Sequence, residues 1–289
     1  MSDNGGEVLR LAGLRKSYNV GLPTELEVLH GLDLTLGRHD AMNTAWLAPQ
    51  WQAPANVHAC ITTRQTPGVS QPPFEQCNLG SRCGDAPEAV AHNRASLVET
   101  LKLPSAPVWL QQVHGTEVYG PEPATRSNDR EPQADAAVTR LPRVVLAILT
   151  ADCLPVLFCS RDGSEVAAAH AGWRGLNAGV LESTLAHMQA APVDVLAWIG
   201  PAIGAGSYEV GKDVRDAFVD SDPHTACAFS PSRPGHWHCD LTAIARQRLL
   251  AVGVASISSA AVDTRSDPRF YSYRRAAVTG RFASLIWRE

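Results

Sequence analysis

The sequence lacks the features that mark several broad classes of protein. In its 289 residues no apolar run approaches the roughly 20 residues that cross a bilayer, and the start lacks the basic and apolar pattern of a secretory signal. The net charge of −4 gives no broad basic surface for nucleic acid, and repeats are missing. With 45% apolar and 19% charged residues, we expect a globular cytoplasmic protein without membrane or nucleic-acid partners.

The cysteines do not form the pattern of a disulfide framework. There are seven, an odd number, and their spacings are irregular in a chain of this length. Such usage is typical of reduced thiols in a cytoplasmic protein, with one or two of them in a functional site.

The first 41 residues differ in character from the rest. The stretch "VLRLAGLRKSYNVGLPTELEVLHGLDLTLG" resembles the opening strands of an ABC-transporter ATPase subunit of the lipoprotein-releasing type. The resemblance ends at Gly37, before a phosphate-binding loop could begin, and a fresh start follows at Met42. We therefore predict that 1–41 is a leader or fusion segment without a role in function, and that 42–289 is the catalytic domain.

From Met42 onward, apolar runs typical of buried strands alternate with helical patterns. This alternation predicts a single α/β domain with a mixed sheet flanked by helices. Asp85 and Asp240 are expected to cap the first and the last helix, and 121–133 is expected to form a loop. The expected strands cover 57–64, 108–115, 144–149, 166–169 and 195–200, and the expected helices cover 85–101, 177–190 and 240–250.

The run "LTADCLPVL" places an acid and a thiol inside what reads as a core strand. A buried carboxylate costs several kcal/mol unless it is paired, so Asp152 and Cys153 are either structural or part of a site. His114 and His170 also stand where apolar runs give way to glycine-containing loops. Two imidazoles and one thiolate suit Zn²⁺ and leave a fourth position open. The alternative is scattered histidines and a buried thiol, because the spacing matches no local zinc motif.

The stretch "HAGWRGLNAGV" predicts a second feature. A strand, a glycine-bearing turn and a helix start would bring backbone N–H groups and Arg174 together at a helix N-terminus. That arrangement suits a phosphate or a carboxylate. The alternative is a tight turn with a surface arginine.

Two motif-like stretches are rejected. "GSYEVGKD" ends in Asp213 where a phosphate loop needs Ser or Thr, so we expect a helix to start within 208–213 instead. "HWHC" resembles half of a copper-oxidase motif, but the further histidine pairs of such enzymes are missing. We expect 236–239 to be a loop that leads to the cap at Asp240.

Several segments together resemble one family. "NLGSRCGDAPEAVAHNR", "WLQQVHG", "ADAAVT", "LTADCLPVL", "AAAHAGWRGLNAGVL", "WIGPAIGAGSYEVG" and "DPRFYSYRR" are similar to the YfiH family, in the right order and across about 56–289. Its members are variously called laccase-domain proteins, multicopper polyphenol oxidases and purine nucleoside phosphorylases. The resemblance implies the fold of that family and one zinc site held by His114, Cys153 and His170.

The resemblance also implies roles for residues around the metal. Asp152 would orient a neighbour or move a proton, and Gln112 would project to the same face as His114. The substrate or phosphate would be bound by Arg64, Asn78 and Arg174.

The implied activity is that of a zinc-dependent enzyme acting on small molecules. It would phosphorolyse adenosine, inosine, guanosine and methylthioadenosine, and would deaminate adenosine through a metal-bound water. The alternatives are a copper-dependent polyphenol oxidase of the laccase type and an enzyme that edits peptidoglycan precursors. Ser207, Asp263 and Ser266 stand where many members carry cysteine, which weakens the case for additional copper sites.

Overall fold

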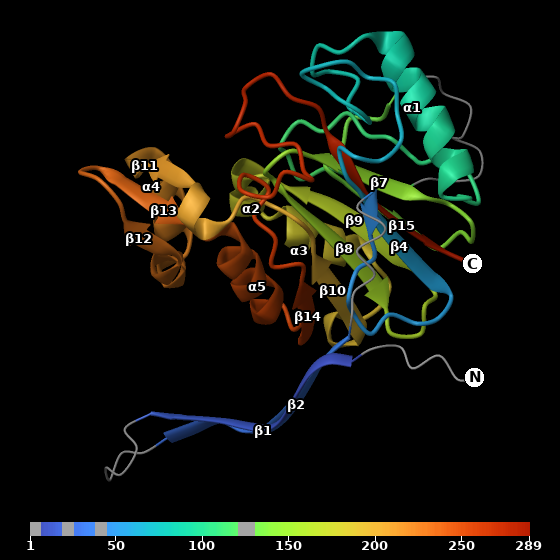
Figure 1. Cartoon of the computed structure of the whole chain (residues 1–289). Helices are drawn as coiled ribbons and strands as arrows, with labels where there is room; N and C mark the ends of the chain where they lie inside the picture. Colours follow the sequence, from blue (N-terminus) through green and yellow to red (C-terminus); the bar gives the residue numbers. More distant parts are fainter. Residues whose placement is uncertain (1–6, 19–25, 38–44, 121–130) are drawn as a thin grey trace. The chain divides into compact units, whose positions relative to one another are not determined.

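The computed structural model describes residues 7–18, 26–37, 45–120 and 131–289 (Figure 1). The chain divides into two compact units, Met1–Asn43 and Thr44–Glu289. In the first unit, β1 (Glu7–Tyr18) pairs antiparallel with β2 (Leu26–Gly37). The proposed lack of function of 1–41 stays a prediction, because this pairing does not test it.

The second unit is a mixed α/β structure. Its described strands form a six-stranded sheet in the order β14-β10-β8-β9-β6-β5, a four-stranded sheet in the order β3-β4-β15-β7, and a three-stranded sheet in the order β11-β13-β12. The strands are β3 (Trp46–Leu47), β4 (Val57–Thr62), β5 (Val118–Tyr119), β6 (Ala136–Thr139), β7 (Leu146–Thr150), β8 (Leu154–Ser160), β9 (Val166–Ala171), β10 (Val195–Ile199), β11 (Glu209–Gly211), β12 (Phe229–Pro231), β13 (His236–Cys239), β14 (Ser256–Ser259) and β15 (Phe282–Arg288). The helices are α1 (Pro87–Thr100), α2 (Trp173–Ala178), α3 (Val180–His187), α4 (Lys212–Ser221) and α5 (Leu241–Ala251).

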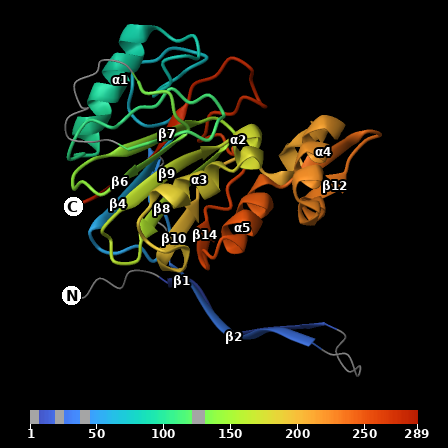
Figure 2. The same ribbon diagram turned by 180° about the vertical axis from the view of Figure 1, so that it is seen from behind.

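The six-stranded sheet is mixed, as predicted. β10 pairs parallel with β14 and β5 with β6, whereas the pairs of β8 with β10, β8 with β9, and β6 with β9 are antiparallel. Helices α3 and α5 cover one face, as Figure 2 shows from behind. There Val156, Phe158 and Ala169 pack against Leu181 and Ile244 in a buried apolar cluster.

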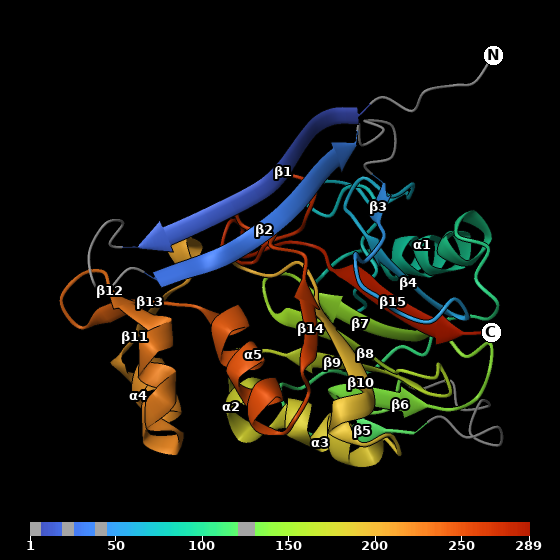
Figure 3. The same ribbon diagram turned by 90° about the horizontal axis from the view of Figure 1, so that it is seen from below.

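The other face of this sheet packs against the four-stranded sheet. Figure 3 shows β4, β7 and β15 on the side of β8 and β9 opposite to α3. Leu157, Ala168 and Trp198 lie in one buried cluster with Ile148 and Phe282. Residues near the outer side of the four-stranded sheet, such as Ala283 and Leu285, cluster with Leu97 of α1. The strands are therefore buried on both faces, which explains why they read as continuous apolar runs.

Two predicted elements are corrected by the structure, and a third is confirmed. The segment 108–115 is not a strand, since only isolated bridges at Val108 and Gln111 connect it to neighbours. The helix expected to start within 208–213 is α4, which begins at Lys212 directly after the short strand β11. The stretch "HWHC" is not a loop but strand β13, which pairs with β11 and β12.

The helix boundaries match the predictions in part. Asp240 caps α5 by accepting a hydrogen bond from the backbone N–H of Ala243, as predicted. The cap of α1 is Ala86 rather than Asp85. The helix expected at 177–190 is divided into α2 and α3, because Gly179 adopts a left-handed conformation at φ 96°. Of the loop expected at 121–133, 121–130 lies outside the described residues.

None of the described helices is both long and apolar enough to span a bilayer.

Candidate metal centre and substrate pocket

Cys153 lies in the turn between β7 and β8, next to a residue with unusual backbone geometry. Asp152 adopts φ 96°, in the left-handed region that non-glycine residues rarely enter. Its carboxylate accepts hydrogen bonds from the Thr264 hydroxyl and the Arg274 backbone N–H, each at 2.7 Å. Both oxygens of this buried acid are therefore satisfied by protein groups. Asp152 fixes the turn that carries Cys153, which fits the orienting role predicted for it.

His114 and His170 are both held by Asp135, a buried residue at the start of β6. One carboxylate oxygen of Asp135 lies 2.8 Å from Nδ1 of His170 and accepts the backbone N–H of His114 at 2.9 Å. The other accepts the N–H groups of Val113 and Gly115. Burial raises the pKa of Asp135, but these hydrogen bonds and the charge of His170 outweigh it and lower the pKa. A carboxylate thus binds one imidazole and shapes the loop that carries the other.

The three predicted metal ligands meet at one point. One ligand atom from each of His114, Cys153 and His170 lies within 4.8 Å of the other two, and the Cys153 sulfur is 3.8 Å from Nε2 of His114. Because Nδ1 of His170 is bound to Asp135, its Nε2 is available as a ligand. Two imidazoles and one thiolate form a suitable donor set for Zn²⁺. The residues present therefore fit a single metal ion.

Two glycines allow α2 to approach this centre closely. A Cβ on Gly172 would lie 2.6 Å from Cδ2 of His114 and 3.2 Å from the Cys153 sulfur. A Cβ on Gly175 would lie 2.8 Å from the carbonyl oxygen of Gly115. The glycines of "HAGWRG" thus provide room for the ligands.

The electrostatics of the cluster favour the metal-binding form of the thiol. Burial raises the pKa of Cys153, but the charge of His170 and hydrogen bonds from both imidazoles outweigh it and bring the pKa down to about 6. Burial lowers the pKa of His170, but the thiolate and Asp135 outweigh it and raise the pKa to about 9. A thiolate is the form of cysteine that binds metals.

The three ligands lie in the wall of a cavity of about 480 Å³. This volume is within the range of roughly 300–1,000 Å³ that is usual for small-molecule sites. Aromatic side chains line it at Trp173, Tyr208 and Tyr273, and four arginines reach it. The arginines are Arg82, Arg174, Arg274 and Arg281.

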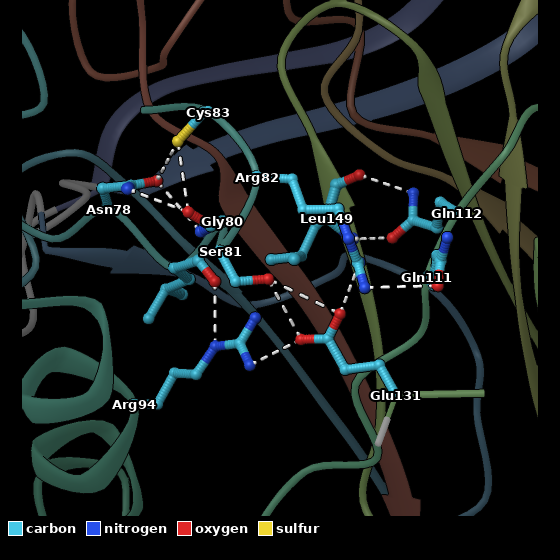
Figure 4. A network of polar contacts seen from close by, with 11 residues as sticks. Asn78, Gly80, Ser81, Arg82, Cys83, Arg94, Gln111, Gln112, Glu131 and Leu149 are labelled. Atoms are coloured by element: carbon cyan, nitrogen blue, oxygen red, sulfur yellow. Dashed lines mark hydrogen bonds and ion pairs between the residues drawn. The ribbon is translucent and has the colours of Figure 1, made fainter. Parts of the chain in front are cut away.

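One wall of the cavity is a polar network, drawn in Figure 4. Glu131 forms ion pairs with Arg82 at 2.6 Å and Arg94 at 2.8 Å. In the same view the Gln112 amide bonds both the backbone N–H and the carbonyl of Leu149, each at 2.8 Å. Both ends of the Gln112 amide are therefore used within the protein. Gln112 lines the cavity, and its contacts are those of a support for the loop that carries His114.

The residues predicted to bind substrate or phosphate fall in two groups. Arg174 lines the cavity, on the short helix α2. Arg64 and Asn78 are not among the lining residues, and the prediction does not match their positions. Arg64 is paired with Glu75 at 2.6 Å, and Asn78 is fully buried with hydrogen bonds to Gly80 and Asp85.

Asp135, Glu131, Tyr208 and Arg274 are among the residues of the site that were not predicted from the sequence. For Asp135 a signal exists, since an acid directly before the apolar run "AAV" needs a partner once buried. Arg274 and Tyr208 carry no such signal, because they reach the cavity only through the tertiary fold.

Ser207, Asp263 and Ser266, where the resemblance implies cysteine in many members of the family, also meet. The Asp263 carboxylate accepts hydrogen bonds from the hydroxyls of Ser207 at 2.6 Å and Ser266 at 3.0 Å. The three side chains are thus joined to one another by hydrogen bonds. Among the described residues, His114, Cys153 and His170 form the one group of three or more ligands close enough for a metal.

Comparison with known proteins gives one consistent result. Residues 58–289 match the family model described as multi-copper polyphenol oxidoreductase laccase. A Xylella fastidiosa protein named purine nucleoside phosphorylase is 51% identical over 83% of this chain and 96% of its own length. An Escherichia coli protein named purine nucleoside phosphorylase YfiH is 48% identical over 83% of this chain and 98% of its own.

Solved structures agree. A Neisseria meningitidis protein matches with a TM-score of 0.80 and 46% identity, over 85% of this chain and 99% of that chain. A Bacillus licheniformis structure called hypothetical protein YfiH matches with a TM-score of 0.76 and 30% identity, over 81% and 93% of the two chains.

Proposed function

The chain belongs to the multi-copper polyphenol oxidoreductase laccase family, which confirms the resemblance to YfiH, and from this premise we propose that it is a zinc-dependent purine nucleoside enzyme. The reactions proposed are phosphorolysis of adenosine, inosine, guanosine and methylthioadenosine, and deamination of adenosine. Relatives at 51% and 48% identity carry the name purine nucleoside phosphorylase, which supports the first of these. A cytoplasmic location is part of the proposal, since all seven cysteines, each in the described part, are free thiols.

One observation carries the proposal. His114, Cys153 and His170 bring ligand atoms within 4.8 Å of one another in the wall of a cavity of about 480 Å³. Three protein ligands leave room for a fourth, as in catalytic rather than structural zinc sites. A zinc ion bound there would supply Lewis acidity and lower the pKa of a coordinated water.

The remaining lining residues suit a nucleoside. Trp173, Tyr208 and Tyr273 offer aromatic surface against which a purine would pack. Arg174 offers a guanidinium for an anion. Asp135 keeps the histidines in place while substrate enters and leaves.

The family description favours a second candidate, oxidation of phenols with copper. Reduction of O₂ by four electrons in laccases uses several copper centres. In the part of the chain that the structure describes, a single cluster of suitable ligands occurs. We therefore place this activity second.

Product analysis with adenosine tests the proposal. The purified full chain, at measured zinc and copper contents, would be incubated with adenosine with and without phosphate. We expect adenine and ribose 1-phosphate when phosphate is present, and inosine as the product of deamination. Turnover of phenols that follows copper content, with no nucleoside turnover, would overturn the proposal.

A pair of cysteine variants provides the control. Cys153→Ala removes a proposed ligand and should abolish turnover, whereas Cys227→Ala removes an exposed thiol outside the cavity and should leave turnover unchanged.

A further inference from the structure

Three of the four arginines in the cavity wall lack an anionic partner among the described residues, and two of these three, Arg174 and Arg274, stack on aromatic rings. Arg82 is paired with Glu131, and Arg281 donates to the carbonyls of Thr279 and Gly280 in its own turn. The guanidinium groups of Arg174 and Arg274 form no ion pair with any carboxylate in the described part of the chain. Charged groups that line a cavity without a partner are available to a ligand.

Aromatic rings hold both of these side chains in place. The Arg174 guanidinium lies 4.4 Å from the ring centre of Trp173, and that of Arg274 lies 5.0 Å from the ring centre of Tyr208. One Arg274 nitrogen also donates to the backbone carbonyl of Glu209 at 2.7 Å. An arginine has five N–H donors, so most donors of both groups remain for a ligand. Stacking fixes the groups in advance and reduces the entropy lost on binding.

Both arginines are anchored beside the metal ligands. The backbone N–H of Arg274 is bound to Asp152, the residue before Cys153. Arg174 is two residues after Gly172, and a Cβ on Gly172 would lie 2.6 Å from the His114 ring and 3.2 Å from the Cys153 sulfur. Both arginines line the same cavity as His114, Cys153 and His170.

Tyr208 adds a neutral donor at the same place. Its ring lines the cavity, and its hydroxyl forms no hydrogen bond with another described residue. Burial raises the pKa of Tyr208, with Cys239 and Cys153 acting in the same direction and the charges of Arg274 and Arg174 opposing them. The phenol keeps its proton and can donate it in a hydrogen bond.

We infer that Arg174, Arg274 and the Tyr208 hydroxyl form a binding site for a phosphate group beside the metal centre. Two positive charges match a phosphate dianion, and guanidinium groups bind phosphate oxygens in a bidentate manner. The Asp152 carboxylate is bound to the Thr264 hydroxyl and the Arg274 backbone N–H, and it forms no ion pair with either guanidinium. The role as the site of inorganic phosphate rests on the proposed function, while the same chemistry would accept the phosphate of a nucleotide.

Calorimetric titration of the full chain with inorganic phosphate, and separately with adenosine 5′-monophosphate, tests this site. Arg174→Met and Arg274→Met remove the charges but keep a side chain of similar length over each ring. Each should weaken phosphate binding by about tenfold or more, since a charge-assisted hydrogen bond is lost. Tyr208→Phe removes one oxygen atom and should weaken binding a few-fold. Zinc content should stay unchanged in all three variants.

The matched control is Arg161→Met, at the exposed turn between β8 and β9, which should leave both titrations unchanged. In one outcome the parent binds adenosine 5′-monophosphate but no inorganic phosphate, and the two variants bind the monophosphate more weakly. That result would identify a nucleotide as the source of the phosphate group. Phosphate affinity within twofold of the parent in both variants would overturn the site.

The two proposals fail in different ways. If the parent binds phosphate through these arginines but turns over no nucleoside, the phosphate site stands and the proposed function fails. If nucleoside turnover occurs and its KM for phosphate is the same in both variants, the proposed function stands and the phosphate site is wrong.

Discussion

Asp135 is the residue on which the geometry of the candidate metal centre depends most. It is fully buried and bonds the ring of His170 and three consecutive backbone N–H groups around His114. Carboxylates that orient metal-binding histidines typically contribute 10- to 100-fold to metal affinity. Removal of the Asp135 charge would therefore weaken the support of both His114 and His170.

We predict that Asp135→Asn lowers zinc affinity by about 10- to 100-fold, because the amide cannot accept all four hydrogen bonds. Competition with a chromogenic chelator measures this. Asp162→Asn, in the exposed turn between β8 and β9, should leave zinc affinity unchanged. Equal affinity in Asp135→Asn and the parent would show that the histidines do not need this carboxylate.

Gly172 should tolerate no side chain. A Cβ there would lie 2.6 Å from the His114 ring, and the backbone of α2 would have to move away. We predict that Gly172→Ala lowers zinc affinity and turnover by about tenfold or more, as expected when a ligand is displaced by about 1 Å. Gly206→Ala, where a Cβ meets nothing within 4 Å, serves as the control. An alanine variant with full zinc affinity would contradict the close packing.

At the scale of residues, the sequence predicts the metal ligands better than the groups that bind substrate. His114, Cys153 and His170 stand next to apolar runs, and the family resemblance rather than their spacing singles them out as ligands. Arg274 reaches Asp152 across 122 residues of sequence separation, and no local pattern indicates that contact. Arg64 was expected in the site, but its charge is used by Glu75 in another part of the fold.

At the scale of elements, the segment 108–115 shows how a side chain can replace a strand pairing. It was expected to be a strand, and it runs beside β7. The amide of Gln112 takes the place of a backbone neighbour by bonding both polar groups of Leu149. A continuous ladder of strand hydrogen bonds would keep the backbone extended at His114. Without it the chain turns there, and His114 adopts φ 63°.

We predict that Gln112→Ala destabilises the protein by about 1–3 kcal/mol, because two backbone groups of Leu149 lose their partners. Zinc affinity should fall as well, since His114 lies two residues further on. Urea denaturation measures the free energy of unfolding. Gln111→Ala, next in sequence, removes only an exposed contact to Arg82 and should change stability by less than about 0.5 kcal/mol.

Short elements were the least predictable from the sequence. The pattern of β13 predicts a loop because the strand spans only His236–Cys239 and its partners β11 and β12 have three residues each. Conversely, one helix was expected at 177–190 because its apolar spacing is continuous, and only the left-handed Gly179 divides it.

At the scale of the whole molecule, all candidate site residues lie in the unit Thr44–Glu289. The relatives in Xylella fastidiosa and Escherichia coli are matched over 96% and 98% of their length by 83% of this chain, and the family match begins at residue 58. The described strands β1 and β2 pair with each other in a sheet of their own.

We predict that deletion of 1–43 leaves turnover within about twofold of the parent and shifts Tm by no more than a few degrees. Thermal unfolding and an adenosine assay on both chains measure this. Loss of turnover or of folding in the shortened chain would show that the first unit contributes to the enzyme.

The most direct test of the central claim is a zinc titration of metal-free protein, followed by adenosine turnover and bound zinc. The account predicts that turnover rises in proportion to bound zinc and reaches its maximum at one zinc per chain, and that His170→Ala abolishes this rise. Full turnover by metal-free protein, or a maximum that requires additional metal ions, would contradict a single His114–Cys153–His170 centre as the site of the reaction.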